Sequence, residues 1–339
     1  MRYESVCIEG MGYVIPEQVV TSSWFEEQLT PIYRRLNIKR SFFERITGIH
    51  ERRWWNDGIQ PSDGATMAGK LALEQAGVTA NDVDCLINAS VCRDYIEPAT
   101  AAFVHNNLGL RPNAMSFDVV NACLGFLNAM VNIANMIELG QIKTGLVVAA
   151  ESPRAGQLAT LQRMLGDGIT RDDLRDNLAS FTLGAASVAM VLTHKSISRT
   201  GRRLLGGISY SATENNHLCV AQRHWMRTDS TALLEEGSKV VHKAWGIFLK
   251  EIGWTTDMVS RLFTHQVSEP VRRSVYKMLG MPKDGLDYPN LRFLGNTASV
   301  AAPLCMAMGI ADGILKSGDK VCLLGAGSGV NSLILGIQW

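Results

Sequence analysis

The sequence lacks several of the patterns by which protein classes are often recognised. Its 339 residues contain seven widely spaced cysteines and no CxxC pair, which argues against both a disulfide framework and a zinc site. The longest weakly polar run, 298–311, contains a proline and spans about 14 residues, too few to cross a bilayer of roughly 30 Å as a helix. The formal net charge is +1, so charge gives no reason to expect nucleic acid or an anionic membrane as the main partner.

The amino-terminal segment also lacks the apolar core of a secretion signal, because charged residues interrupt it: Arg2, Glu4 and Glu9. No Walker loop is present, and the glycine-rich stretch GAGSGVN is not followed by the helix and strand of a dinucleotide-binding unit. We therefore expect a soluble cytoplasmic protein with no integral membrane segment, no bound metal and no cofactor. Its hydrophobic content of 46% is enough for a large core in one domain or two coupled domains.

What the sequence does contain is an alternation of helix-like and strand-like segments, which indicates an α/β architecture. The stretch Leu71–Ser90 predicts a helix, a glycine stop, a polar turn and a strand, and Ile247–Gln266 repeats this order 176 residues later. Nearly continuous apolar strands suit sheets that helices cover on both faces. The repeat favours two similar halves, residues 1–195 and 196–339, stacked as five alternating layers of helices and sheets. Two unrelated units with similar turn residues are the alternative.

One polar and charged segment, residues 153–180, has no counterpart in the second half. It is predicted to be an insertion in the first half. Insertions of this kind often shape a pocket or an interface, so we expect this one to do the same.

Cys123 stands where a strand-like run changes into a helix-like run, within the stretch Phe117–Met130. The start of a helix offers free N–H groups and the positive end of the helix dipole, which stabilise a thiolate. Gly125, in the first turn, is expected to let a substrate approach. Three other cysteines lie within apolar runs and are expected to be inert core residues: Cys85, Cys305 and Cys322. From the residues alone, Cys123 is equally well a nucleophile or a core residue.

His265 and Asn296 are the polar residues that the second half offers to such a cysteine. His265 follows the strand-like run RLFT, near the end at which α/β sheets bind ligands. Asn296 follows the strand-like run NLRFL and is, by the repeat, the counterpart of Cys123. A lone histidine is more often structural, but a cysteine and an asparagine at equivalent positions favour a shared catalytic site.

Three motifs carry a resemblance to a known family. DVVNACLGF, THQVSEP and GNTASVAAP, in this order and followed by GAGSG, resemble the thiolase superfamily and, within it, the β-ketoacyl synthase III branch. The stretches SVCRDYIEPATA and YSATENNHLC are most similar to the OleA-type enzymes of that branch, which condense two long-chain fatty acyl-CoA molecules head to head. The resemblance covers essentially the whole chain. It implies a duplicated thiolase fold and a catalytic group formed by Cys123, His265 and Asn296.

The resemblance also implies a base, an oxyanion site and a homodimer. Glu97 corresponds to the glutamate that removes the α-proton of the second acyl chain and acts across the dimer interface. The backbone N–H groups of Cys123, Gly327 and Gly329 are implied as oxyanion-hole donors. From the residues alone, Glu97 is instead a solvated loop carboxylate before Pro98. An ordinary carboxylate acts as such a base only with help from burial and from an acidified α-carbon.

A cluster of cations with two adjacent tryptophans lies between positions 34 and 55: Arg34, Arg35, Lys39, Arg40, Arg45, Arg52, Arg53, Trp54 and Trp55. Cations for phosphates and an aromatic ring for adenine suit CoA, or the phosphopantetheine of an acyl carrier protein. The alternative is a solvated helix face followed by a packed aromatic pair. The selected candidates for CoA contacts are Arg45, Arg52, Arg53 and Trp54.

Together these features predict an acyltransferase that joins two fatty acyl-CoA molecules by non-decarboxylative Claisen condensation, through an acyl-cysteine, to a β-ketoacyl-CoA. CoA enters only as part of the substrate, and an acyl carrier protein is an alternative donor. The same residues suit a decarboxylating β-ketoacyl synthase III that uses a malonyl thioester, and also an acyltransferase or thioesterase. A catalytically silent dimer partner is a third class, which the intact Cys123, His265 and Asn296 disfavour.

Overall fold

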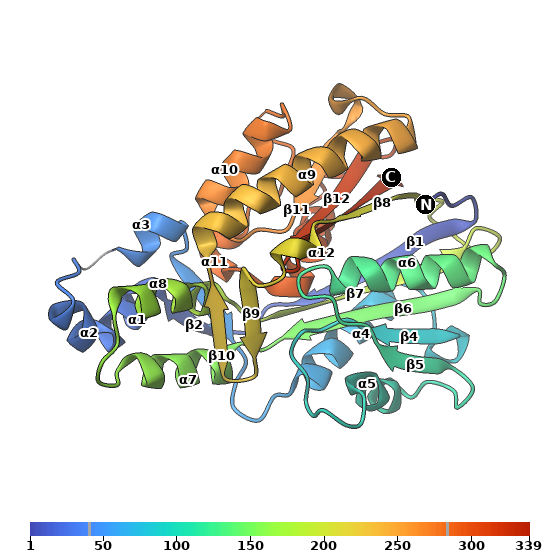
Figure 1. Cartoon of the computed structure of the whole chain (residues 1–339). Coiled ribbons are helices and arrows are strands. Elements are labelled where there is room, and N and C mark those ends of the chain that lie inside the picture. The colour runs from blue at the N-terminus through green and yellow to red at the C-terminus, as the bar shows by residue number, and fades with distance from the viewer. Residues whose placement is uncertain (40–41, 283–284) are drawn as a thin grey trace.

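The strands of the two predicted halves are joined edge to edge in one mixed sheet. The computed structural model describes residues 1–39, 42–282 and 285–339. Within them, nine strands follow the order β11-β12-β13-β8-β1-β7-β6-β4-β5 (Figure 1). The strand bounds are β1 (Val6–Val14), β4 (Cys85–Asn88), β5 (Met115–Asp118), β6 (Thr144–Glu151), β7 (Ala186–His194), β8 (Arg203–Ser211), β11 (Arg261–Thr264), β12 (Lys320–Gly327) and β13 (Asn331–Gln338).

Two groups of strands within this sheet have the same topology. In the first, β4 pairs parallel with β6, β6 antiparallel with β7, and β7 antiparallel with β1. In the second, β11, β12, β13 and β8 pair in the same order and with the same directions. This agreement confirms the repeat that the sequence predicted. The two expected sheets are linked into one where Cys7 of β1 pairs with Arg203 of β8. The division at residue 195 stays a prediction.

Helices complete the predicted five-layer arrangement. In the middle layer, α6 (Gly125–Glu138) and α12 (Ala301–Ala311) share one hydrophobic core with both strand groups. On one outer face, α4 (Pro61–Ala76) and α5 (Thr100–Leu108) pack on the first group. On the other, α9 (Ser230–Ile252) and α10 (Glu269–Met278) pack on the second (Figure 1).

The repeated helix stops have a conformational cause. α4 ends at Gly77 with φ of 58°, and α9 ends at Gly253 with φ of 74°. Residues with a side chain are strained in this left-handed region, so a glycine ends each helix. After a single 3-10 turn, η1 (Ala80–Asp82) or η4 (Thr256–Met258), the chain enters β4 or β11.

One predicted strand is a helix. The run NLRFL forms α11 (Leu291–Leu294), with Leu291 and Leu294 buried and Phe293 51% exposed. Burial at a spacing of three residues is the helical pattern, and a run this short does not separate helix from strand by periodicity. Asn296 therefore follows a helical turn and not a strand, while its position ahead of the middle-layer helix α12 corresponds to that of Cys123 ahead of α6.

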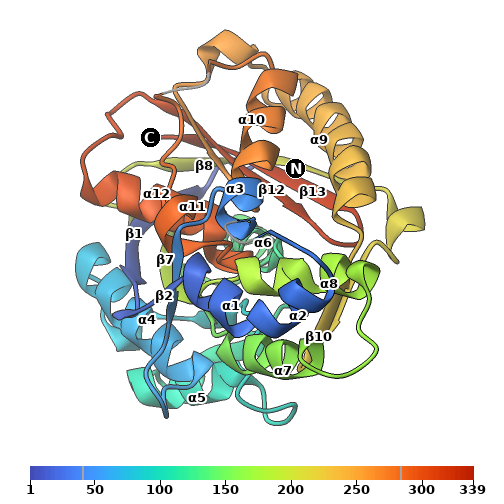
Figure 2. The same cartoon turned by 90° about the vertical axis from the view of Figure 1, so that its left-hand side faces the viewer.

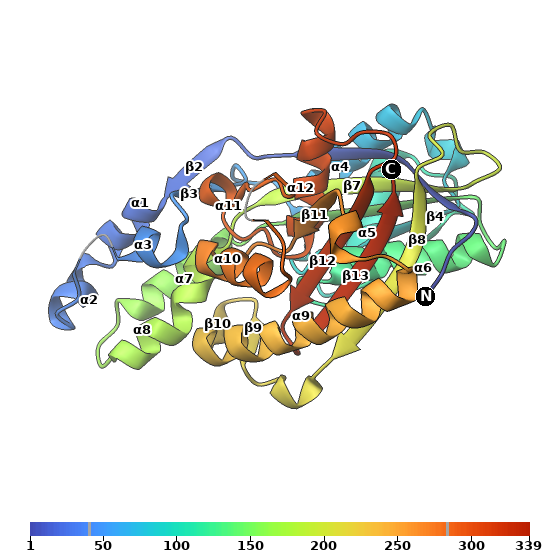
Figure 3. The same ribbon diagram turned by 90° about the horizontal axis from the view of Figure 1, so that it is seen from above.

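A helical cap projects from one end of the sheet and has its own hydrophobic cluster. Its members are α1 (Ser22–Gln28), α2 (Thr30–Arg35), α3 (Phe43–Thr47), α7 (Arg154–Met164), α8 (Arg171–Asn177), η2 (Leu178–Thr182) and the strand pair β2 (Gln18–Thr21) and β3 (Glu51–Trp54). The predicted insertion supplies α7, α8 and η2. Figure 2 views the molecule from the end that carries the cap, and Figure 3 shows the cap at the end away from the chain termini. Beside it lies the hairpin of β9 (Cys219–Gln222) and β10 (Trp225–Thr228), which follows η3 (Thr213–Asn215).

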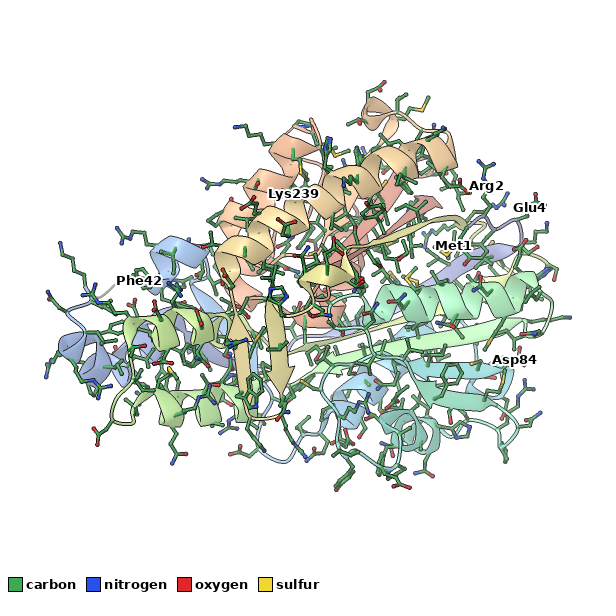
Figure 4. The ribbon with its side chains drawn as sticks, in the orientation of Figure 1. Met1, Arg2, Glu4, Phe42, Asp84 and Lys239 are labelled. Atoms are coloured by element: carbon green, nitrogen blue, oxygen red, sulfur yellow. The ribbon has the colours of Figure 1, made fainter. Side chains whose placement is uncertain are left out.

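At the end of the sheet away from the cap, Asp84 links the starts of β4 and β6. The carboxylate of Asp84 accepts hydrogen bonds from the N–H groups of Lys143 and Thr144, at 2.8 and 3.0 Å. Figure 4 shows Asp84 at this end and Phe42 in the cap. Since β4 and β6 run parallel from Asp84, their carboxyl ends point toward the cap, where sheets of this type bind ligands.

Candidate active site

Cys123 lies in a tight turn between β5 and α6. Ala122 before it has φ of 44°, a left-handed conformation that residues other than glycine seldom adopt. The N–H of Leu124 donates to the carbonyl oxygen of Asn121 at 2.9 Å, and α6 begins one residue later, at Gly125. Strained turns of this kind are frequent at functional sites. The turn places Cys123 at the start of a buried helix, as the sequence predicted.

Gly125 is required by packing, and its expected role in admitting substrate stays a prediction. A Cβ atom at this position would lie 2.5 Å from the carbonyl oxygen of Ala89, which follows β4. Such a distance is far inside van der Waals contact, so any side chain would push α6 away from the sheet. The missing side chain lets the helix start close to β4.

Three parts of the site converge at the end of β12. A Cβ atom at Gly327, the last residue of β12, would be 3.5 Å from both Cβ and the main-chain nitrogen of Cys123. His265 directly follows β11, and its N–H donates to the carbonyl oxygen of Leu324 in β12 at 2.9 Å. Because β11 and β12 are parallel, their carboxyl ends meet at the same edge of the sheet. Cys123, His265 and Gly327 therefore lie at one edge.

Asn296 is held in place by its own main chain. Its N–H donates to the carbonyl oxygen of Thr182 at 2.8 Å, and its carbonyl oxygen accepts from the N–H of Gly184 at 2.9 Å. The side-chain Oδ1 accepts from the N–H of Ala298 at 2.9 Å. A main-chain N–H can only donate, so this bond fixes the orientation of the amide and leaves Nδ2 as a donor for another group.

Burial keeps the Cys123 side chain in its neutral form. The pKa of its thiol is raised to about 12, first by desolvation and then by the nearby Cys219 and Glu151. Its own main-chain N–H favours the thiolate, but this effect is smaller. The expectation that the helix start lowers the thiol pKa is wrong for the free protein, because desolvation of the charged form outweighs the dipole.

His265 is neutral for the same reason. Desolvation lowers its pKa to about 4, and in the described part of the chain its Nδ1 has no protein hydrogen-bond partner. A neutral imidazole with an unpaired nitrogen can accept a proton. The resting site therefore combines a protonated thiol with an imidazole base, and the proton has to move while Cys123 attacks.

A cavity of about 450 Å³ opens beside Asn296. Its walls include Glu151 at the end of β6, the loop 91–96, residues 152–160 of the insertion, and the β9–β10 hairpin. The insertion therefore shapes a pocket, as predicted. Cys123 and His265 keep partly accessible side chains although their charged forms are desolvated. Neither Cys123 nor His265 is among the described residues that line this cavity.

Glu97 lies in the exposed part of the loop after β4. Its side chain is exposed, and that of Ile96 is 90% exposed. The loop is fixed where it enters α5, because the carboxylate of Asp118 accepts from the N–H groups of Thr100 and Ala101, both at 2.9 Å. Among the described residues that line the cavity, Glu97 is absent. A single chain thus presents Glu97 to the outside, and its role as the catalytic base stays a prediction.

Two of the four candidates for CoA contacts are core residues. Arg52 is 0% exposed, donates to the carbonyl oxygen of Phe181 at 2.7 Å and to Ser22 Oγ at 3.1 Å, and has its pKa lowered to about 9 by desolvation. Trp54 is 4% exposed, and its Nε1 donates to Gln157 Oε1 at 2.6 Å. The predictions for Arg52 and Trp54 are wrong, because both side chains are buried and form hydrogen bonds inside the cap.

The other two candidates retain access to solvent. Arg45 is exposed on α3. Arg53 is partly exposed and forms an ion pair of 2.7 Å with Glu51. Arg40, from the same cationic cluster, lies outside the described residues. Arg45 and Arg53 remain predicted CoA contacts, with Arg45 the freer of the two.

The glycines of the β12–β13 turn allow close approach to the cysteine. Gly327 contacts the Cys123 backbone, as described above, and Gly329 has φ of 126°, which side chains rarely adopt. The backbone therefore needs a glycine at 329, whereas a Cβ atom at 327 would make only ordinary van der Waals contact with the cysteine. Their N–H groups as oxyanion-hole donors remain a prediction.

Glu151 and Ser299 are polar residues near the site that sequence reasoning missed. Glu151 ends the fully buried strand β6 and is 2% exposed, and its carboxylate accepts a hydrogen bond from Ser299 Oγ. An ionisable residue that ends an otherwise apolar strand was the available signal, because burial of a carboxylate needs dedicated partners.

Two features are absent from the part of the chain that the structure describes. No helix in the ranges 1–39, 42–282 and 285–339 is long and apolar enough to cross a membrane. In the same ranges, no group of three or more histidine, cysteine, aspartate or glutamate side chains is arranged to hold a metal ion.

Comparison with known proteins decides the family. Models of the family described as 3-oxoacyl-[acyl-carrier-protein] synthase III match residues 117–157 and, for its C-terminal part, residues 249–339. An acyl-CoA:acyl-CoA alkyltransferase of Shewanella oneidensis is 38% identical, over 100% of this chain and 100% of that protein. The chain belongs to the acyl-CoA:acyl-CoA alkyltransferase family.

Structural comparison agrees with this alkyltransferase assignment. A solved structure of Xanthomonas campestris OleA, in a cysteine-to-serine variant with bound lauric acid and lauroyl-CoA, matches with a TM-score of 0.97 at 36% identity, over 99% of this chain and 100% of that one. A β-ketoacyl-[acyl-carrier-protein] synthase III of Staphylococcus saprophyticus is 26% identical, over 98% of this chain and 99% of that protein. The thiolase-like fold and the OleA-type resemblance predicted from the motifs are confirmed.

Proposed function

We propose that this enzyme joins two fatty acyl-CoA molecules by non-decarboxylative Claisen condensation and releases a β-ketoacyl-CoA. The observation that carries the proposal is the convergence of the Cys123 turn, His265 and the β12 end at one sheet edge, close to a cavity bordered by Asn296. Membership of the alkyltransferase family supports the choice of acyl-CoA for both substrates.

In the first half-reaction, Cys123 accepts an acyl group. The Cys123 sulfur attacks the thioester carbon of the first acyl-CoA while its proton passes to neutral His265. The carbon–sulfur bond to CoA breaks, and the CoA thiolate leaves with that proton. In this proposal, backbone N–H groups of Cys123, Gly327 and Gly329 stabilise the oxyanion of the tetrahedral intermediate.

In the second half-reaction, a new carbon–carbon bond forms. The second acyl-CoA loses an α-proton to a carboxylate, and its thioester oxygen becomes an enolate that accepts hydrogen bonds from Asn296 Nδ2 and His265. The enolate carbon attacks the acyl-cysteine, and the Cys123 thiolate leaves and is reprotonated. The products of the whole reaction are one β-ketoacyl-CoA and one free CoA.

Glu97 supplies the carboxylate in this proposal, from the partner subunit of a homodimer. Two features of the chain support this. Glu97 is exposed on a loop whose neighbouring residues, such as Ile96, are also exposed, as in a surface that another subunit covers. The same loop is anchored at its end by Asp118, so the carboxylate is presented on a defined backbone.

The two remaining functions on this scaffold use the same acyl-cysteine. A decarboxylating synthase obtains its carbanion by loss of CO2 from a malonyl thioester and needs no base. A thioesterase or another acyltransferase passes the acyl group to water, oxygen or nitrogen and forms no carbon–carbon bond.

Incubation with acyl-CoA alone, followed by mass analysis of the products, separates these functions. We expect a β-keto product without a malonyl donor. A strict requirement for malonyl thioester with release of CO2 would replace the proposal by the synthase, and free fatty acid as the sole product would replace it by the thioesterase.

Mixing two inactive variants tests the partner's carboxylate. Glu97→Ala and Cys123→Ala homodimers should each be inactive in condensation. If Glu97 acts across the interface, subunit exchange between them should restore about a quarter of wild-type activity, since half of the dimers are mixed and each has one complete site. Absence of recovery, with exchange verified by mass spectrometry, would place Glu97 in its own subunit's site.

A further inference from the structure

The proposed reaction gives no role to a buried carboxylate that borders the cavity. Glu151 is the last residue of β6 and is 2% exposed. It lines the cavity beside Asn296, and it is close enough to Cys123 to contribute to the raised pKa of that thiol. Burial of a carboxylate costs free energy, so a buried carboxylate this close to reacting groups indicates a structural or functional role.

The Glu151 carboxylate receives hydrogen bonds from two different segments. Oε1 accepts from the N–H of Val91 at 2.9 Å, and Oε2 accepts from the N–H of Cys92 at 3.1 Å. Ser299 Oγ donates to Oε1. Burial raises the pKa of Glu151, and these donors, together with the Cys92 thiol, oppose that rise. The carboxylate is thus surrounded by donors on both oxygens.

Each of these segments carries a residue of the second half-reaction. Val91 and Cys92 begin the loop that presents Glu97 five residues later. Ser299 lies three residues after Asn296, in the 3-10 helix η5 (Ala298–Val300). One side chain therefore links the loop of the base to the loop of the enolate-binding amide. The segment that carries Cys123 is not among these partners, and it contacts Gly327 instead.

We propose that Glu151 is a positioning residue for carbon–carbon bond formation, which fixes the Asn296 loop and the root of the Glu97 loop through Ser299 and the N–H groups of residues 91 and 92. This inference rests on the proposed condensation. It predicts that loss of the carboxylate affects the second half-reaction more than the first, because Cys123 and Gly327 are held by other contacts.

Glu151→Gln tests this with little change in volume. The variant keeps one oxygen acceptor, but its NH2 group faces a donor N–H of Val91 or Cys92, so one of the two main-chain bonds to the Glu97 loop is lost. Mass spectrometry of the intact protein measures the rate of Cys123 acylation, which we expect to stay within about threefold of wild type. We expect the ratio of β-keto product to hydrolysed fatty acid to fall by about tenfold or more, since small displacements of reacting groups have large effects on rate.

Ser299→Ala and the double variant test whether Glu151 acts on the Asn296 loop through Ser299. Ser299→Ala removes only the link to the Asn296 loop, so its product ratio should fall by a smaller factor. If Glu151 acts partly through Ser299, the double variant should show less than the product of the two single effects. Fully multiplicative effects would show that Ser299 is not part of the mechanism proposed for Glu151.

Glu9→Gln is the matched control. Glu9 is 4% exposed, and its carboxylate likewise accepts from a main-chain N–H, of Arg199, and from a serine hydroxyl, of Ser198. It fixes the turn between β7 and β8, which carries no proposed catalytic residue. The product ratio of this variant should equal that of wild type, whatever the loss in thermal stability.

The outcomes separate the possible failures. A wild-type product ratio in Glu151→Gln, or equal loss of acylation and condensation, would overturn the positioning role. If Glu151→Gln does not fold, an unchanged ratio in Ser299→Ala overturns it instead. If the wild-type enzyme forms the acyl-cysteine and never the β-keto product, the proposed function itself fails.

Discussion

The N–H of Ala298 donates a hydrogen bond to Oδ1 of Asn296, at 2.9 Å. A backbone donor two residues away therefore decides which end of the amide is available for substrate. The amide oxygen is already used, and the nitrogen can serve an enolate oxygen. A substitution at position 296 can therefore remove the donor nitrogen and still keep the hydrogen bond from Ala298.

Asn296→Asp should fold like wild type and lose condensation. The aspartate still accepts from Ala298, but it has no N–H to donate and places a negative charge beside the developing enolate. Loss of one such donor costs about 10²–10³ in rate. Steady-state condensation measured beside Cys123 acylation checks this. Asn296→Ala, which also removes the local bond, should be equally inactive and less stable in thermal denaturation. Acylation reduced as strongly as condensation in the aspartate variant would contradict the assigned role.

The alkylation of Cys123 should show no plateau near neutral pH. A thiol of pKa about 12 has a thiolate fraction at pH 7 roughly 10³ lower than a thiol of pKa 9, because the fraction falls tenfold for each unit of pKa. The rate with iodoacetamide should rise about tenfold per pH unit from pH 7 to 10. Peptide mapping by mass spectrometry assigns the modified cysteine, and Cys123→Ala supplies the background. A constant rate between pH 6 and 8 would instead demonstrate a preformed pair of thiolate and imidazolium. In that case the pKa of Cys123 would be lowered and that of His265 raised, which contradicts the directions given above.

Asp118→Ala should destabilise the protein through the start of α5. The carboxylate accepts from two free N–H groups of the first turn, those of Thr100 and Ala101, and from Asn88 Nδ2 at 3.2 Å. Loss of a helix cap costs about 1–2 kcal/mol. Urea denaturation should show a lower midpoint with an unchanged m-value. Asp82→Ala, which removes an exposed carboxylate from the short helix η1, is a suitable comparison and should have a smaller effect.

Arg45→Ala should raise KM for acyl-CoA several-fold without a change in stability. Arg45 is exposed, and an exposed cation that contacts a phosphate contributes to binding and not to folding. Thioesters of N-acetylcysteamine, which lack the nucleotide, provide the control, because their KM should be the same for both proteins. An equal rise in KM for both substrates would show that Arg45 does not contact the nucleotide. Arg52→Ala should differ from it, with a large loss of stability, because it leaves its buried partners unpaired.

The sequence predicted the parts of the fold that depend on local conformation. Gly77 and Gly253 end equivalent helices because only glycine adopts their backbone angles easily, and such stops are visible without a structure. The strand-like interpretation of NLRFL was wrong because its burial, with Phe293 exposed, depends on how the run packs against β3. A five-residue apolar run does not contain that information.

The candidate site was predictable where residue type alone sets the chemistry. Cys123, His265 and Asn296 were identified in this way and by family resemblance. Arg52 and Arg45 look alike in sequence, yet one is fully buried and the other exposed, since the cap folds over only one of them. The pKa of Cys123 could not be predicted either, because the dipole of the helix is a local property and desolvation is a property of the whole fold.

Glu151 and Gly327 occupy the same place in the two strand groups, at the ends of β6 and β12. Each receives a loop from the opposite half: Gly327 contacts the turn of Cys123, and Glu151 bonds Ser299 of the Asn296 loop. This reciprocal contact is the pattern of a symmetric dimer whose two subunits have been fused into one polypeptide. Chimeras that exchange a single half between relatives should therefore fail unless the strand end and the loop it contacts are transferred together.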